Sequence, residues 1–197
     1  MFNLTKSKSM DKILKKTTYL IFIILLISCG TNKDITNTKV NSYPNSKYKK
    51  SRTAYSGTLN KNEYDELIKR LELELKTTIP NDKSILINYN QKAPNCINFR
   101  FSEKDNKQVT NNRIRISSRI SSNYNAIDFF VYAKDSYNNG IYEQMTEFIM
   151  DSGFFYENVF TEHQNCAGFL IIKPNGEFYK QYGEDYYSDV KAFFEIK

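Results

Sequence analysis

The sequence predicts a mixed α/β fold, in which helices cover both faces of a mixed β-sheet. Apolar, β-branched runs alternate along the chain with segments of helical periodicity, an order that favours parallel strands joined by helical crossovers. Near the C-terminus, Asn175-Gly176 separates two apolar runs, which is typical of an antiparallel hairpin. Phe and Tyr make up 15% of the 197 residues, enough aromatic side chains to build a core.

The first element of the predicted domain is a helix. Asn60 and Glu63 have the spacing of a capping box, and Leu59 is placed to pack at the helix entry. One helical face is apolar and consists of Tyr64, Leu67, Ile68, Leu71 and Leu75. Pro80 and Asn81 end the element.

Two strands are predicted next, separated by a segment that fits more than one structure. Residues 85–87 form a short apolar run that predicts a buried strand, and QKAPNC after it is a loop. Residues 126–133, AIDFFVYA, predict the second strand. Residues 97–126 stay open, because Ile114, Ile116 and Ile120 suit an alternating strand or a weak helix.

A second helix is predicted after the break at 138–140. Its apolar positions recur at helical spacing: Ile141, Tyr142, Met145, Phe148 and Ile149. Gly153 stands where the residue after a helix C-terminus belongs. Residues 154–160, FFYENVF, predict a short strand or an extended loop.

The C-terminal part predicts a hairpin and a closing helix. Residues 167–172 and 177–182 are the two strands, and 173–176 is the turn between them. The last helix has an apolar face formed by Tyr186, Val190, Phe193 and Phe194.

Residues 1–28 are predicted to be a signal peptide. Lys12, Lys15 and Lys16 precede nine apolar residues, 19–27. A membrane-spanning helix needs about 20 apolar residues, so this run suits a secretory signal better than a resident span.

The end of this run, Leu26-Ile27-Ser28-Cys29, resembles the lipobox of bacterial lipoproteins. The resemblance implies that the Cys29 thiol receives diacylglycerol, that cleavage precedes Cys29, and that its new amine can take an acyl chain such as palmitate. Two or more acyl chains anchor a protein stably. We therefore expect a lipoprotein of the cell envelope, anchored to an inner or outer bacterial membrane with its domain outside the cytoplasm. The alternative is an ordinary secreted protein in which Cys29 is incidental.

Residues 29–57 are predicted to be the lipidated Cys29 and a flexible tether, and residues 58–197 the globular domain. The tether is rich in Asn, Thr, Ser and Lys, so Tyr43, Tyr48 and Tyr55 are expected to be solvated. Outside residues 1–28, 23 basic residues stand against 21 acidic ones. This near neutrality argues against a nucleic-acid partner.

The order of elements over residues 80–197 resembles the thioredoxin fold. FLIIKPNGEFYKQYGEDYYSDVKAFFEI is similar to the strand–turn–strand–helix half of thioredoxin-like proteins, and SILINYNQKAPNC to the strand leading into their redox loop. The chain departs from the redox-active members, because Ala93 and Phe99 leave Cys96 without a Cys-x-x-Cys partner. It also lacks, in HQNCAGF, the proline that the family holds in a cis peptide bond.

The resemblance implies that the loop containing Cys96 and the loop containing Cys166 meet at one end of the sheet. With Cys29 assigned to lipid, these are the remaining two thiols in an oxidising compartment, and we predict a Cys96–Cys166 disulfide. The bond is either a structural link or a redox-active pair. In the second case His163, three residues before Cys166, is the candidate that adjusts a thiol pKa.

No metal site and no cofactor are expected. One His and two Cys do not readily supply the three or four ligands that zinc needs. Nucleophile-elbow and phosphate-loop patterns are missing from the sequence. Glu184, Asp185 and Asp189 suit a cation-binding surface, or simply favour a helix N-terminus.

Three functions are consistent with these features. The first is a membrane-anchored binding or interaction module without catalysis, whose partner is a ligand or another envelope protein. The second is a divergent thiol–disulfide oxidoreductase that uses Cys96 and Cys166. The third is an envelope lipoprotein of another α/β fold, in which the two cysteines lie too far apart to bond. We rank the first highest.

Overall fold

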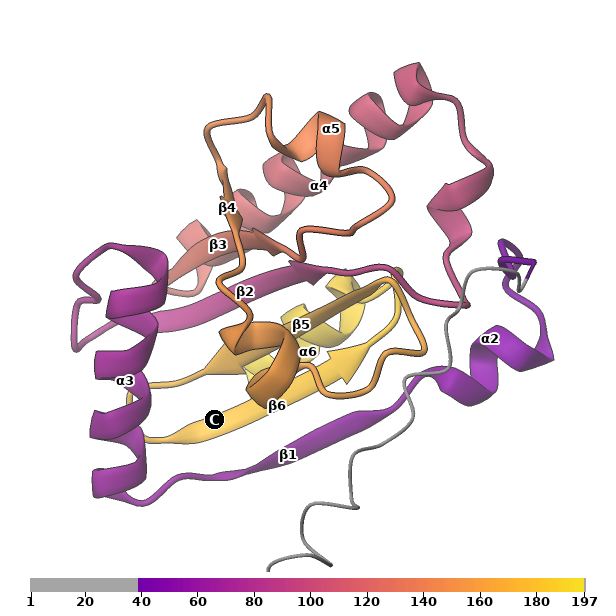
Figure 1. Ribbon diagram of the computed structural model, residues 1–197. Helices are drawn as coiled ribbons and strands as arrows, with labels where there is room; N and C mark the ends of the chain where they lie inside the picture. The colour runs from indigo at the N-terminus through magenta and orange to yellow at the C-terminus, as the bar shows by residue number, and fades with distance from the viewer. Residues whose placement is uncertain (1–38, 197) are drawn as a thin grey trace, which may run out of the picture. The chain divides into compact units, whose positions relative to one another are not determined.

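The computed structural model describes residues 39–196, and a six-stranded mixed sheet forms its centre (Figure 1). The strands are β1 Ala54–Thr58, β2 Ser84–Asn90, β3 Ala126–Tyr132, β4 Phe148–Met150, β5 Ala167–Ile172 and β6 Glu177–Tyr182. Their order in the sheet is β1-β6-β5-β2-β3-β4. Strands β2, β3 and β4 pair in parallel, whereas β2–β5, β5–β6 and β6–β1 pair antiparallel.

Helices lie on both faces of this sheet, as the sequence predicted. They are α2 Ser46–Ser51, α3 Lys61–Leu75, α4 Glu103–Asn123, α5 Asn139–Tyr142 and α6 Tyr187–Glu195, with a 3₁₀ turn η1 Ile97–Arg100 and a π-helical turn η2 Phe155–Val159. On one face, α3 and η2 cover Ile85 and Ile87 of the fully buried β2. On the other, α4 and α6 cover Leu86. The arrangement is consistent with a thioredoxin-like α/β fold.

The elements with clear local signals form where they were predicted. In α3 the Asn60 side chain accepts the Glu63 backbone N–H at 3.1 Å, and Glu63 accepts the Asn60 N–H at 2.8 Å. Strands β5 and β6 form the predicted hairpin. Its Gly176 has φ +86°, and an added Cβ there would lie 2.6 Å from the Leu59 carbonyl oxygen. Only glycine suits this position without strain.

Helix α4 settles the segment that the sequence left open. Most of its buried side chains are small and polar: Asn106, Thr110, Ser117 and Ser121, with Ile120 as the buried aliphatic residue. The sequence of this segment therefore lacks the continuous apolar face by which an amphipathic helix is recognised. Asn88 of β2 donates to Ser117 Oγ at 2.9 Å, so part of this helix–sheet contact is polar.

The helix predicted from Ile141 onward is wrong beyond its first turn. Helix α5 ends at Tyr142, and Phe148 begins β4, which pairs with β3. The ring of Phe148 stacks on Tyr142 with centroids 4.4 Å apart and packs on Phe130 at 5.4 Å. Backbone pairing with β3 and these aromatic contacts outweigh the helical spacing of the apolar residues.

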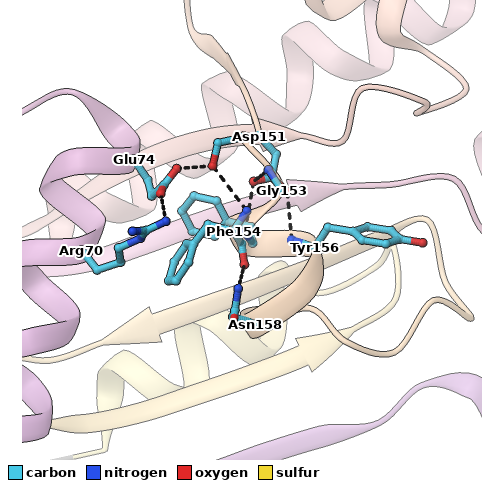
Figure 2. Close-up of polar contacts among 9 residues, drawn as sticks. Arg70, Glu74, Asp151, Gly153, Phe154, Tyr156 and Asn158 are labelled. Carbon is cyan, nitrogen blue, oxygen red and sulfur yellow. Dashed lines mark hydrogen bonds and ion pairs between the residues drawn. The ribbon is translucent and has the colours of Figure 1, made fainter. Parts of the chain in front are cut away.

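The strand or extended loop predicted at 154–160 is also wrong, since these residues form η2. The cause is the Asp151 carboxylate, which accepts the backbone N–H groups of Gly153, Phe155 and Tyr156 at 2.9–3.0 Å. Figure 2 shows Asp151 beside Gly153 and Tyr156 at the start of this turn. The turn then buries Phe155 completely. Gly153, expected after a helix, instead precedes this turn with φ +111°.

An Arg70–Glu74 pair on α3 lies beside this turn (Figure 2). The Arg70 guanidinium stands 4.8 Å over the Phe154 ring, and Glu74 accepts a hydrogen bond from Ser152. These contacts join η2 to α3 on one face of the sheet. They serve the fold, because the Glu74 carboxyl group is bound by both Arg70 and Ser152.

The predicted tether is wrong for its described part, residues 39–57. Ordered elements begin before residue 58, because α2 spans Ser46–Ser51 and β1 spans Ala54–Thr58. Strand β1 pairs with β6, and Tyr48 of α2 is buried and accepts the Glu184 N–H at 2.8 Å. Tyr43 and Tyr55 are exposed, as expected. The predicted signal peptide, Cys29 and residues 30–38 lie outside the described residues.

None of the helices within residues 39–196 is long and apolar enough to cross a membrane.

Candidate functional site

Cys96 and Cys166 are joined by a disulfide, the pairing that the thioredoxin-like resemblance predicted. Their Cα atoms are 5.2 Å apart, which removes the basis for treating them as distant and incidental. Cys96 precedes η1 and Cys166 precedes β5. The backbone holds both in place, because the Cys96 N–H donates to Asn41 O and the Cys166 N–H to Asn95 O, each at 3.0 Å. Both side chains are buried, at 2% and 8% exposure.

Glu184, on the turn after β6, lies directly against this disulfide. Its Oε1 is 2.7 Å from Cys166 Sγ. The same carboxyl group accepts the backbone N–H of Ile97 at 2.7 Å and of Asn98 at 3.2 Å. Burial raises the pKa of Glu184 to about 7, although these two N–H groups and the charge of Arg113 act in the opposite direction.

A small cavity of about 10 Å³ adjoins the disulfide, and Glu184 and Arg113 both line it. The Arg113 guanidinium donates to Asn90 Oδ1 at 2.8 Å and to Tyr186 OH at 2.9 Å. Its Nε is buried without a partner. No carboxylate lies within ion-pair distance of Arg113 in the part of the chain that the structure describes.

His163 does not reach the cysteine sulfurs through any hydrogen bond of the described residues. Its Nδ1 is 2.9 Å from Gln91 Oε1, and its ring stacks on Tyr156 with centroids 3.8 Å apart. Burial lowers the pKa of His163. Its connection to Cys166 runs through Gln91, whose backbone N–H donates to the Cys166 carbonyl at 2.9 Å.

A larger groove of about 440 Å³ opens beside the small cavity and shares Tyr137 and Asn138 with it. It lies between η1 with the start of α4 and the segment around α5. Its lining residues are mostly aromatic or amide-bearing: Phe99, Phe101, Glu103, Asn106, Tyr137, Asn138, Asn139, Gly140, Ile141 and Gln144.

Asn106 distinguishes this groove from two hollows of similar size on the described surface. The residue is 6% exposed, and its Nδ2 donates to the Phe101 carbonyl at 3.2 Å. Its Oδ1 has no hydrogen-bond partner. Hollows of about 410 and 460 Å³ occur beside Leu59 and Arg52, and within residues 39–196 neither is lined by a buried polar atom without a partner.

The rim of the groove is aromatic. Phe99 is 49% exposed and meets the Tyr137 ring edge-on, with centroids 4.8 Å apart. The Tyr137 hydroxyl donates to the Ala93 carbonyl at 3.3 Å. Because Phe99 follows Cys96 by three residues in η1, the disulfide fixes the segment that carries this ring.

Sequence reasoning missed Asn106 and Arg113 as site residues, because it left the secondary structure of residues 97–126 open. It considered Glu184 only as part of an acidic surface with Asp185 and Asp189. The structure separates these three residues. Glu184 contacts the disulfide, Asp185 is exposed, and Asp189 pairs with Arg52 at 3.2 Å.

No family model matches this chain, and neither a curated protein nor a solved structure matches it.

Proposed function

We propose that this protein is a lipid-anchored lipoprotein of the bacterial cell envelope whose domain, outside the cytoplasm, binds an uncharged saccharide in the groove beside Phe99 and Asn106. It acts as a binding module without catalysis. The observation that carries the proposal is that Asn106, one of the residues lining this groove, has a buried side-chain oxygen, Oδ1, without a hydrogen-bond partner.

A buried acceptor without a partner costs about 1–3 kcal/mol, which a ligand hydroxyl or amide N–H could recover on binding. The neighbouring amides of Asn138, Asn139 and Gln144 can both donate and accept. A ligand that carries several hydroxyl groups matches this lining better than one that only accepts hydrogen bonds.

The aromatic rim of the groove and its low charge favour an uncharged sugar over an anionic ligand. A sugar ring presents an apolar C–H face, which can lie on the exposed Phe99 ring, while its hydroxyls point to the amides. Glu103 is the one charged residue among the described residues that line the groove, so nothing there recruits an anionic ligand.

The same lining favours binding without cleavage. Glycoside hydrolysis ordinarily needs two carboxyl groups on either side of the scissile bond. Of the described residues lining the groove, Glu103 alone carries a carboxyl group. The buried disulfide then serves to hold η1, and with it Phe99, against the sheet.

Titration calorimetry with two neutral probes, an N-acetylglucosamine tetramer and a glucose tetramer, tests this function. We expect at least one probe to bind, and Asn106→Ala to weaken that binding by about tenfold, the equivalent of one buried hydrogen bond. Asn111→Ala is the matched control, because Asn111 lies on α4 and is exposed. The proposal fails if neither tetramer binds, or if both variants bind like the unmodified protein.

The anchor is tested separately by growing cells with an alkyne-tagged palmitate. The chain should become labelled, and Cys29→Ala should abolish the label because it removes the thiol that takes diacylglycerol. Equal labelling of both proteins would contradict the lipoprotein assignment.

Thiol–disulfide exchange through Cys96 and Cys166 is the second candidate, and the contact of Glu184 with Cys166 Sγ favours it. A carboxyl group at this distance can pass a proton to a departing thiolate. The burial of both sulfurs favours a structural bond instead. Thiol trapping across a glutathione series decides between them, since a bond that opens near −200 mV would indicate exchange.

A further inference from the structure

We propose that Cys96 and Cys166, when their disulfide is reduced by a dithiol, form together with Glu184 a binding site for Zn²⁺. The sequence offered too few ligands for zinc, and the fold supplies the third from the turn 18 residues after Cys166. The proposal is independent of saccharide binding.

The ligand atoms are already close enough for one ion. The two sulfurs and a carboxylate oxygen of Glu184 all lie within 4.8 Å of one another. Zn–S and Zn–O bonds are about 2.3 Å and 2.0–2.2 Å long, so ligands of a tetrahedral ion stand roughly 3.5–3.8 Å apart. The freed sulfurs must separate to that distance, and side-chain rotation from Cα atoms 5.2 Å apart achieves it.

The redox step balances with a dithiol as reductant. The dithiol transfers two electrons to the Cys96–Cys166 bond and becomes a cyclic disulfide, while its two protons pass to the cysteine sulfurs. Zn²⁺ then displaces both thiol protons, together with the proton of any Glu184 carboxyl group that is protonated, and binds two thiolates and the Glu184 carboxylate; the displaced protons pass to the solvent.

Arg113 supplies the charge that this complex needs. Two thiolates, one carboxylate and Zn²⁺ together carry a net charge of about −1, which is costly to bury alone. The Arg113 guanidinium lines the same cavity and has no carboxylate within ion-pair distance among the described residues. Its buried Nε still lacks a partner.

The surroundings also hold the Glu184 ligand in place and leave space for a fourth ligand of the ion. Backbone N–H groups of Ile97 and Asn98 hold the Glu184 carboxyl group, as outer groups hold the ligands of metal sites. The adjoining cavity of about 10 Å³ approaches the space that one water needs as fourth ligand. Two thiolates with one carboxylate select Zn²⁺ over Mg²⁺ or Ca²⁺.

The test uses the full chain in detergent with Cys29→Ser, so that no third thiol is present. The protein is reduced on an immobilised dithiol without oxygen, and Zn²⁺ is titrated against a chromophoric chelator. We expect one Zn²⁺ per reduced chain and none per oxidised chain. Glu184→Gln should weaken binding by at least about tenfold, whereas Asp185→Asn, the exposed neighbouring carboxylate, should change it less than twofold.

A second measurement does not depend on any site variant being folded. Co²⁺ added to the reduced chain should give the visible absorption bands of a tetrahedral thiolate site, and these bands should be missing from the oxidised chain. The proposal is overturned if the reduced chain binds no more Zn²⁺ than the oxidised chain. It is equally overturned if Co²⁺ gives no such bands, or if folded Glu184→Gln binds Zn²⁺ like the parent.

Discussion

Removing the disulfide is expected to destabilise the fold by about 4 kcal/mol. The perturbation is the double variant Cys96→Ala/Cys166→Ala, which keeps small apolar side chains at two buried positions. The bond closes a loop with a sequence separation of 70 residues. In the chain-entropy model a closed loop of this length removes about 15 cal/mol/K from the unfolded chain, or about 4 kcal/mol at 25 °C.

The assay is urea-induced unfolding followed by far-ultraviolet circular dichroism. Three samples are compared: the oxidised protein, the same protein reduced by a dithiol, and the double variant. The reduced protein and the double variant should agree, because both lack the cross-link and both keep the native contacts around Ala93. The folded state should persist in both, since domains of this size are typically stable by about 5–15 kcal/mol.

A loss below about 1 kcal/mol would refute the reasoning. It would mean that residues 96 and 166 stay close in the unfolded chain without the bond, so that closing the loop saves little entropy. A loss in the double variant but not in the reduced protein would instead assign the effect to packing of the sulfur atoms.

Three further predictions concern single residues. Asp151→Ala should cost about 3–5 kcal/mol in urea unfolding, because it leaves the buried Tyr89 hydroxyl and three backbone N–H groups without their acceptor; a loss below about 1 kcal/mol would contradict this. Gly176→Ala should lower stability by about 1–3 kcal/mol through its positive φ and its contact with the Leu59 carbonyl, while Gly140→Ala, in open space, should not. The pKa of Glu184 is raised from 4.5 to about 7, so the folded state holds a proton that the unfolded chain releases. Stability should therefore fall by at most about 3 kcal/mol as the pH rises from about 4.5 through 7, and unfolding of Glu184→Gln over the same range should lack this slope.

The locally encoded parts of the fold could be read from the sequence. The Asn60–Glu63 capping box, the apolar face of α3 and the Asn175-Gly176 turn each act over a few residues, so their signals are complete in the chain itself. The buried strand β2 is equally clear, because both of its faces are covered and residues 85–87 at its centre form an apolar run.

Elements that depend on contacts between distant segments of the chain could not be predicted from the sequence. Helix α4 buries mostly Ser, Thr and Asn, so its apolar period is too weak to separate a helix from a strand. Phe148 has helical spacing from Met145 but joins β3 as part of β4. Strand β1 looks like a polar tether, and it forms a strand because β6 offers a free edge to its backbone.

The features of the candidate site also fall into those encoded locally in the sequence and those decided by distant contacts. The sequence by itself determined the apolar run before Cys29, the helix caps, the hairpin and the identity of the two thiols. Only the tertiary structure set Glu184 against Cys166, left Arg113 Nε and Asn106 Oδ1 without partners, and placed Phe99 at the rim of a groove. The physical reason is that caps and turns depend on neighbours a few residues apart, whereas burial and polar pairing depend on which distant segments the sheet brings together.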